Sequence, residues 1–452
     1  MATEPYRRSK RPVDSGADRQ TQKSVRRQPR WVNAMRRPRH NAALRLQLES
    51  ACRANGCSQS ALTVLSTRID PYRLDTPANH RDATWLAEQL EKSFGSKNTH
   101  WRGLHYSLVM RKRPVKKPDG TAFENTEEDW IWLTETAGKA ARWLGYIPFE
   151  RIIDKRNAPP IIHRKPRVIP AAWADAGLDI EFPDDIGPYP LTRGLIFGEK
   201  ASLDEVVVPI AERFEADVYL QTGEISDTHV YRIAQDAADD GRPLIVFTAS
   251  DCDPSGRQMP VSIARKLQAF RDLLFPDLRF EVVPAALTIE QVRDLRLPST
   301  PMKKGEKRAT RWKQAFGIEQ TEIDALTAPE RMDDLREIIE RAFVPYFDFD
   351  LERRVAEAEA RWIAAAREAI DAQVDADRLA TARARAEELR AAVGDLNAEL
   401  EAIAADIELP PMEVPEPEID EDAPRQALVG LDHEWIEATE ALIAHRSYGD
   451  EP

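Results

Sequence analysis

Residues 243–256, PLIVFTASDCDPSG, carry the clearest architectural signal in the chain. The apolar run 244–247 has no polar interruption, which predicts a strand buried on both faces, as in a parallel sheet. Two carboxylates, Asp251 and Asp253, follow this run. Alternation along an extended backbone sends both to the same side. Because open α/β sheets bind ligands beyond the carboxyl ends of their strands, we expect function at this point.

A second segment of the same form lies upstream. Residues 194–199 read GLIFGE, a short apolar run that ends in Glu199. The hydrophobic pattern around the two acidic sites predicts a short strand over 217–220 and helices over 202–214, 226–238 and 259–270. Strands and helices in this order predict a compact α/β unit.

Glu199, Asp251 and Asp253 are the candidate metal ligands. Neighbouring carboxylates repel each other unless a positive group lies between them, and a hard cation with oxygen ligands is the usual solution. The eight histidines show no zinc-type spacing, so Mg²⁺ is the expected cofactor, with Mn²⁺ as its substitute. The alternative interpretation of the D-x-D pair is an acidic turn at the end of a strand.

The α/β unit resembles the Toprim domain of topoisomerases, primases and certain nucleases, in which an upstream Glu and a D-x-D pair bind magnesium. Residues 101–106, WRGLHY, resemble the R-x-x-Y-Y helix motif of the topoisomerase VI A subunit and the related meiotic double-strand-break protein. The second aromatic of that motif is the nucleophilic tyrosine. The resemblance implies that Tyr106 is the catalytic nucleophile and Arg102 its phosphate-positioning partner. His105 stands where the family has the first tyrosine.

The resemblance covers residues 75–345 approximately. Residues 140–156 resemble the end of the winged-helix region in bacterial relatives, and residues 286–292 and 321–326 resemble the tail of the Toprim domain. The implied fold class is α/β, with a winged-helix DNA-binding domain followed by a Toprim α/β domain. The sequence adds a C-terminal helical coiled-coil extension.

The resemblance implies a magnesium-dependent protein that breaks duplex DNA by tyrosine transesterification, leaving a transient 5′-phosphotyrosine link. A phenol has a pKa of about 10, so its attack needs a nearby cation or base. By resemblance, Tyr106 of one protomer works with the acids of its partner, which requires a homodimer. The chain shows no glycine-rich ATP motif, so a topoisomerase reaction would need a separate ATPase subunit.

Two other functions fit the same residues. In the first, the protein is a Toprim-type hydrolytic nuclease whose metal activates water, and Tyr106 is a structural aromatic packed beside Leu104 and Leu108. In the second, it is a non-catalytic DNA-binding scaffold that acts through its coiled coil.

A basic run, RKRPVKK at 111–117, follows the Tyr106 helix and ends near Asp119-Gly120, a strong turn pair. We interpret it as the wing of a winged helix on the DNA backbone; the alternative is a solvent-exposed loop. The candidate DNA-binding residues are Arg111, Lys112, Arg113, Lys116 and Lys117. A second basic loop, 303–311, is a weaker candidate for the same role.

The two ends of the chain carry opposite charges. Residues 1–40 hold 12 Lys or Arg against three acids, whereas residues 401–452 hold 15 acids against two arginines. The basic end lacks periodic apolar residues, which predicts a disordered tail. Such a tail either neutralises DNA phosphates or contacts the acidic C-terminal segment.

Five parts are expected: a basic tail (1–45), a helical winged-helix-like domain (46–180), a Toprim-like domain with its tail (185–345), a coiled-coil region (350–408), and an acidic proline-rich linker with a short helix (409–452). The coiled-coil region is predicted as a long helix or a helical hairpin, because apolar residues recur at alternating spacings of three and four between Leu379 and Ile407. Three cysteines form no paired framework, and no apolar run approaches a membrane span in length. We therefore expect a cytoplasmic protein without membrane partners, and the resemblance to DNA-cleaving proteins implies association with the nucleoid.

Overall fold

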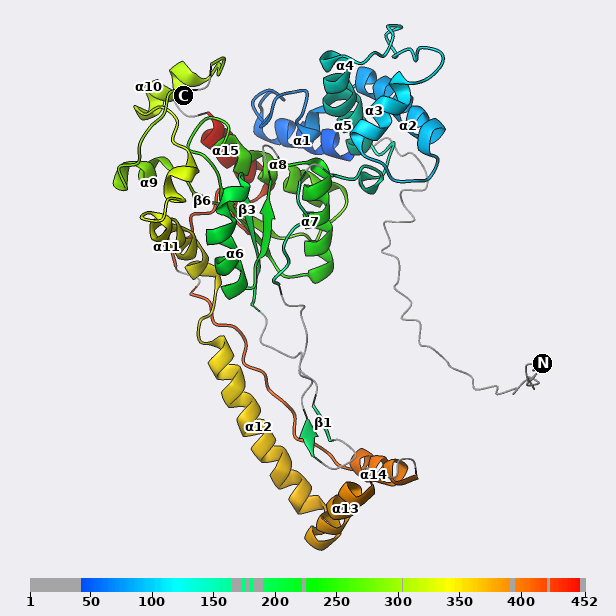
Figure 1. Cartoon of the computed structure of the whole chain (residues 1–452), viewed down its shortest axis with the longest axis vertical. Coiled ribbons are helices and arrows are strands. Elements are labelled where there is room, and N and C mark those ends of the chain that lie inside the picture. Colours follow the sequence, from blue (N-terminus) through cyan, green and yellow to red (C-terminus); the bar gives the residue numbers. More distant parts are fainter. Residues whose placement is uncertain are drawn as a thin grey trace, which may run out of the picture. The chain divides into compact units, whose positions relative to one another are not determined.

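The computed structural model describes residues 42–155, 157–164, 172–174, 179–181, 190–221, 225–302, 304–389, 395–420 and 423–447 (Figure 1). The basic tail predicted over 1–45 lies almost entirely outside these residues. The described residues form a mixed α/β structure with a four-stranded parallel sheet, which confirms the α/β class. None of the described helices combines the length and the apolar character needed to cross a membrane.

Three of the four strands of the sheet were predicted from the sequence, and the fourth, over residues 280–286, was not. The strands are β3 (Arg193–Gly198), β4 (Asp217–Leu220), β5 (Leu244–Ala249) and β6 (Phe280–Ala286). They pair in the order β4-β3-β5-β6, and every pair is parallel. All residues of β3 and β5 are buried, as expected for central strands covered on both faces.

Helices cover both faces of the sheet. The predicted connecting helices are present as α6 (Asp204–Arg213), α7 (Asp227–Asp240) and α8 (Gln258–Leu273), and α11 (Met332–Phe343) follows later in the chain. Ile245, Phe247 and Ala249 share one core cluster with the apolar residues of α6 and α11. Since side chains alternate along a strand, Leu244 and Val246 face the opposite layer, where α8 packs against α7 and β6.

Short segments pair with both edges of the sheet. Ile161 forms an antiparallel bridge with Val218 of β4, and Val429 forms one with Val282 of β6. These bridges satisfy backbone groups that an open edge would leave exposed.

The segment that carries Tyr106 is helical. Its helices are α1 (Ala43–Asn55), η2 (Pro71–Arg73), α2 (Pro77–Phe94), α3 (Trp101–Val109), α4 (Glu127–Ile131), the π-helical turn η3 (Trp132–Ala137), α5 (Gly138–Trp143) and η4 (Phe149–Arg151). Helices α2, α3 and α5 share a core that includes Leu90, Leu104 and Ala140. A Cβ at position 138 would lie 2.5 Å from the ring of Trp101. Glycine there lets α3 pack closely on the start of α5.

A buried ion cluster joins this helical segment to the sheet. Asp227, at the start of α7, accepts hydrogen bonds from Arg142 at 3.2 Å and from Trp143 at 3.0 Å. Lys266 of α8 lies 3.2 Å from its other carboxylate oxygen. Burial raises the pKa of Asp227, but the charges of Lys266, Lys139 and Arg142 outweigh burial and hold this pKa far below the usual range.

The heptad seam packs within the chain. The region contains α12 (Leu351–Gln373), α13 (Ala376–Leu389) and α14 (Asp395–Ala405), and residues 390–394 of the seam lie outside the described residues. Ile370 and Leu379 are buried, and the half-buried Ile403 and Ile407 pack against them. The region is therefore a helical hairpin rather than one long helix (Figure 1). A two-stranded ribbon, β1 (Trp173–Ala174) with β2 (Ile180–Glu181), contacts α12.

The acidic C-terminal segment returns to the sheet. It passes along α12, where the Trp362 indole donates to the Pro410 carbonyl at 2.9 Å. It ends in α15 (Trp435–Arg446), which packs on α8. There the buried Arg265 donates to Thr439 at 3.2 Å and ion-pairs with Asp70 at 3.2 Å. The remaining short helices are η5 (Ala201–Leu203), α9 (Ile289–Asp294), α10 (Ala309–Phe316), η6 (Ile323–Leu326) and η7 (Val344–Tyr346).

Candidate functional site

The candidate metal ligands follow two neighbouring strands. Glu199 comes directly after β3, and Asp251 and Asp253 follow β5. Gly198 pairs with Ala249 across these strands, and the Glu199 N–H donates to the Ala249 carbonyl at 3.0 Å. The Asp251 N–H in turn donates to the Glu199 carboxylate at 3.3 Å. Strand pairing therefore brings Glu199 to the D-x-D turn.

Negative charge is concentrated and partly desolvated here. Asp251 and Asp253 are only 4% and 5% exposed. Burial raises the pKa of Glu199, and the charge of Asp251 raises it further. A carboxylate in this environment gains from a nearby positive charge, because such a charge offsets both desolvation and like-charge repulsion.

Asp253 also shapes the turn in which it lies. Its Oδ1 accepts hydrogen bonds from the N–H groups of Ser255 at 2.8 Å and Gly256 at 2.7 Å. A Cβ at position 256 would lie 1.9 Å from the Asp251 carbonyl oxygen, so only glycine fits. The turn role that the alternative interpretation assigns to the D-x-D pair is thus present for Asp253.

Sequence reasoning missed Lys200 as a partner of these acids. Its Nζ lies 3.0 Å from Oδ1 of Asp251, 2.8 Å from Asp324 and 3.3 Å from Glu322. The lysine follows Glu199 directly, so its position beside the acids is a local signal. Its ammonium group supplies part of the positive charge that the cluster needs.

A long-range bridge brings Glu322 and Asp324 to the site. Cys252 and Thr321 form an antiparallel bridge, and the Ile323 N–H donates to Oδ1 of Asp251 at 2.9 Å. The segment 321–324 therefore crosses the D-x-D turn. Hydrophobic periodicity does not predict a single β-bridge between two segments so far apart in the chain. These two acids were therefore not predicted.

The donor chemistry of Glu199, Asp251 and Asp253 suits Mg²⁺ or Mn²⁺, since all three supply hard carboxylate oxygens. Within the described part of the chain, however, no group of three or more His, Cys, Asp or Glu side chains has the spacing to hold a metal ion. The Lys200 ammonium group already pairs with the Asp251 carboxylate, at 3.0 Å. A cation bound by the three acids would have to compete with this ammonium group.

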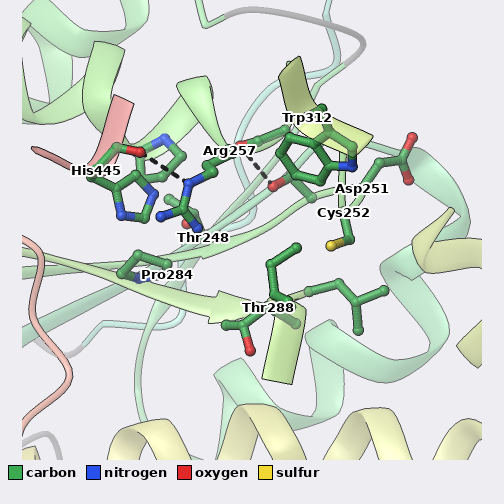
Figure 2. Close-up of a pocket in the computed structure, with 14 residues that line it drawn as sticks. Thr248, Asp251, Cys252, Arg257, Pro284, Thr288, Trp312 and His445 are labelled. Atoms are coloured by element: carbon green, nitrogen blue, oxygen red, sulfur yellow. Dashed lines mark hydrogen bonds between the residues drawn. The ribbon is translucent and has the colours of Figure 1, made fainter. Parts of the chain in front are cut away.

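A small cavity of about 40 Å³ borders the D-x-D turn, and Asp251 and Cys252 are among the residues that line it. Figure 2 shows Arg257 and His445 on one side of it and Trp312 and Cys252 on the other, with the Asp251 carboxylate pointing away from Arg257. Burial raises the pKa of the Cys252 thiol to about 12, and burial together with Arg257 lowers the pKa of His445 to about 4. Both groups are uncharged at neutral pH, and the cavity has room only for water.

Tyr106 lies on the surface of α3. Its side chain is 46% exposed, whereas Leu104 and Leu108 on the same helix are buried. It packs edge-on against the ring of His105 at 5.3 Å between centroids. In the part of the chain that the structure describes, no hydrogen bond joins Tyr106 to Glu199, Asp251 or Asp253.

His105 and Arg102 are held by the surrounding aromatic residues. His105 is buried, its Nε2 lies 2.9 Å from Oδ1 of Asn125, and its ring packs against Trp130. Arg102 is exposed and its guanidinium lies 5.1 Å from the centre of the Trp130 ring. Arg102 and Tyr106 are four residues apart, so they lie on one exposed face of α3.

The basic run forms a hairpin whose cations have unequal roles. Lys116 bridges to Ala122, and the Lys117 N–H donates to the Thr121 carbonyl at 2.8 Å. Lys117 itself lies 2.5 Å from the buried Asp129. Two cations hold the fold together, because Arg111 likewise binds the side chains of Gln89 and Ser93. The exposed members of the run are Lys112, Arg113 and Lys116.

A scan against models of known protein families finds no match, and a search of curated proteins finds none.

Proposed function

We propose that this protein breaks duplex DNA by tyrosine transesterification, in the manner of the topoisomerase VI A subunit that its motifs resemble. The observation that carries the proposal is the meeting of Glu199 with the D-x-D turn at the ends of adjacent parallel strands. In this proposal, residues 185–345 form a Toprim domain and residues 46–180 a winged-helix-like domain. The hairpin that contains Lys116 is its wing.

Tyr106 is the nucleophile in this proposal. Its hydroxyl oxygen forms a bond to a backbone phosphorus, and the bond from that phosphorus to the 3′ oxygen breaks. The phenol loses its proton and the departing 3′ oxygen gains one, which leaves a 5′-phosphotyrosine link and a 3′-hydroxyl. Arg102, one helical turn away, positions the phosphate through charge-assisted hydrogen bonds.

The acids act on the charge of the reacting phosphodiester. Glu199, Asp251 and Asp253 are the residues that would hold Mg²⁺ or Mn²⁺, and a bound cation would supply charge neutralisation for the phosphate. Because Tyr106 has no hydrogen bond to these acids in the described residues, the proposal includes a homodimer in which each protomer supplies one half of the site. A separate ATPase subunit would convert cleavage into strand passage, acting on nucleoid DNA in the cytoplasm.

Duplex DNA would lie along the exposed part of the basic run. Lys112, Arg113 and Lys116 are accessible and suit backbone phosphates, which position a protein without reading sequence. Arg111 and Lys117 support this surface from below through their bonds to the fold.

The proposal is tested with end-labelled duplex DNA incubated with the protein and Mg²⁺, then denatured and resolved by size. We expect DNA breaks with protein attached covalently to the 5′ ends. Tyr106→Phe and Asp251→Ala should each abolish attachment. Tyr146→Phe, which changes a half-buried tyrosine of the same helical segment, and Asp204→Ala, which changes an exposed acid beside the sheet, should retain it.

Other outcomes assign other functions. Breaks that persist in Tyr106→Phe and vanish in Asp251→Ala would identify a hydrolytic nuclease. DNA binding without breaks, with or without an added ATPase subunit, would favour the scaffold acting through its helical hairpin.

A further inference from the structure

Helix α1 ends in a turn that brings two cysteines together. Gly56 follows the last residue of the helix with φ 62° and ψ 28°, the left-handed conformation in which glycine commonly ends a helix. One residue further on, the Cys57 N–H donates to the Cys52 carbonyl at 3.1 Å. This hydrogen bond belongs to the Schellman turn, in which the residue after the glycine folds back onto the last turn of the helix.

The side chains that meet in this turn are both thiols. A Schellman turn commonly pairs two apolar side chains at these positions, and here Cys52 is buried and Cys57 is half-buried. Burial raises the pKa of the Cys52 thiol, and its interaction with Cys57, which includes a hydrogen bond between the two thiols, raises this pKa further. A disulfide needs Cα atoms about 4.4–6.8 Å apart. The direct hydrogen bond between the two backbones holds Cys52 and Cys57 close enough for one.

The third cysteine is in a different environment. Cys252 is buried at the D-x-D turn, and its backbone pairs with Thr321. Burial raises the pKa of its thiol to about 12, and a buried thiol that stays protonated is inert. Cys252 therefore serves as a control within the same molecule.

We propose that Cys52 and Cys57 form a site of reversible oxidation, which a small disulfide such as glutathione disulfide converts to a protein disulfide. Cys57 reacts first because it is partly exposed. Its thiolate attacks one sulfur of the small disulfide, whose S–S bond breaks, and the departing thiolate takes up the proton that Cys57 lost. Cys52 then loses its proton and attacks the Cys57 sulfur, which releases the second small thiol. Two protein thiols are oxidised, and one small disulfide is reduced to two thiols.

The site lies where α1 joins the rest of the molecule. Helix α1 packs against η2 and α8 (Figure 1). The chain that follows Cys57 leads to Asp70, which accepts hydrogen bonds from the Val64 and Leu65 N–H groups and pairs with Arg265 of α8. A disulfide would hold the last turn of α1 against the start of this chain. Neither DNA cleavage nor a divalent cation is involved, so the site is independent of the proposed function.

The whole protein is incubated with glutathione disulfide, its free thiols are alkylated, and its tryptic peptides are identified by mass without reduction. Cleavage after Arg53 separates Cys52 from Cys57, so a disulfide between them joins two peptides that otherwise run apart. We expect the wild type to lose two of its three free thiols, while Cys252 is recovered alkylated. Treatment with a thiol reductant should restore all three.

Two variants separate the roles of the paired thiols. In Cys52→Ala the second step is absent, so Cys57 should stop at a mixed disulfide that carries one glutathione. In Cys57→Ser the exposed thiol is absent, so Cys52 should stay free. Thermal unfolding verifies that both variants are folded before oxidation.

Three results for the wild type would overturn the proposal. In the first, Cys57 carries glutathione while Cys52 stays free. In the second, all three thiols stay free in an excess of glutathione disulfide. In the third, the disulfide joins Cys57 residues of two molecules, which appears as a dimer under denaturing conditions without reductant.

Discussion

The acidic end of the sheet and the Tyr106 face of α3 differ in how much their candidate residues contribute to the fold. Asp251 and Asp253 are buried, and both accept backbone hydrogen bonds that hold the turn and the crossing segment together. Tyr106 is half-exposed, and within the described residues its hydroxyl has no hydrogen bond. A substitution at the acids is therefore expected to perturb the fold, whereas a substitution at Tyr106 should leave the fold almost unchanged; under the proposed function both would affect cleavage.

The largest expected effect comes from breaking the link between the two regions. Asp227→Asn would leave Lys266 and Arg142 buried beside an uncharged amide, and removing one partner of a buried ion pair costs about 3–5 kcal/mol. We expect the free energy of unfolding, measured by urea denaturation, to fall by about 3 kcal/mol. Asp239→Asn, at an exposed site on the same helix, should change it by less than about 0.5 kcal/mol.

The contribution of Asp227 to the free energy of unfolding should depend on pH. The pKa of Asp227 is lowered in the folded protein, so its contribution is complete above the unfolded carboxyl pKa of about 3.9. It is lost as pH falls through the folded value. The difference between wild type and Asp227→Asn should therefore shrink under acidic conditions. A constant difference down to the lowest pH at which the protein folds would contradict this account.

A smaller effect is expected on the affinity of the acidic end of the sheet for divalent cations. Lys200→Met removes the ammonium group that lies on Asp251. If Lys200 competes with a metal, we expect Mg²⁺ or Mn²⁺ to bind about tenfold more tightly by calorimetry, a change of about 1.4 kcal/mol. Lys313→Met, which removes an exposed lysine paired with Glu319, is the control. Weaker cation binding in Lys200→Met would mean that the lysine supports the site instead.

The smallest effect is expected at Tyr106. Tyr106→Phe should lower the free energy of unfolding by less than about 0.5 kcal/mol, because the lost hydroxyl is exposed. Tyr231→Phe is the matched comparison, since the hydroxyl of this buried tyrosine donates to Glu150. Its loss should cost about 1–2 kcal/mol. Equal losses in the two variants would show that Tyr106 has a structural role and would remove the contrast between the regions.

Much of the sheet was predictable because its signals are local. The apolar runs that became β3 and β5 are short, uninterrupted and followed by turn residues, and each is buried along its whole length. The position of Glu199 and the D-x-D pair after these strands followed from the same pattern. The helical hairpin was one of two outcomes that the heptad spacing allowed, and the packing of Ile370 with Ile403 decided between them.

The sequence by itself determined strands β3, β4 and β5 with the helices that follow them, and that acids follow two of these strands, because periodicity and turn chemistry act over a few residues. Only the tertiary structure decided what these acids contact. The bridge from Cys252 to Thr321 brought Glu322 and Asp324 beside Lys200, and Asp129 forms an ion pair with Lys117 of the basic run. The return of α15 to α8 placed Thr439 within hydrogen-bond distance of Arg265. Such contacts join residues far apart in the chain. They depend on how whole helices and strands pack against one another, and this packing cannot be predicted from a short stretch of sequence.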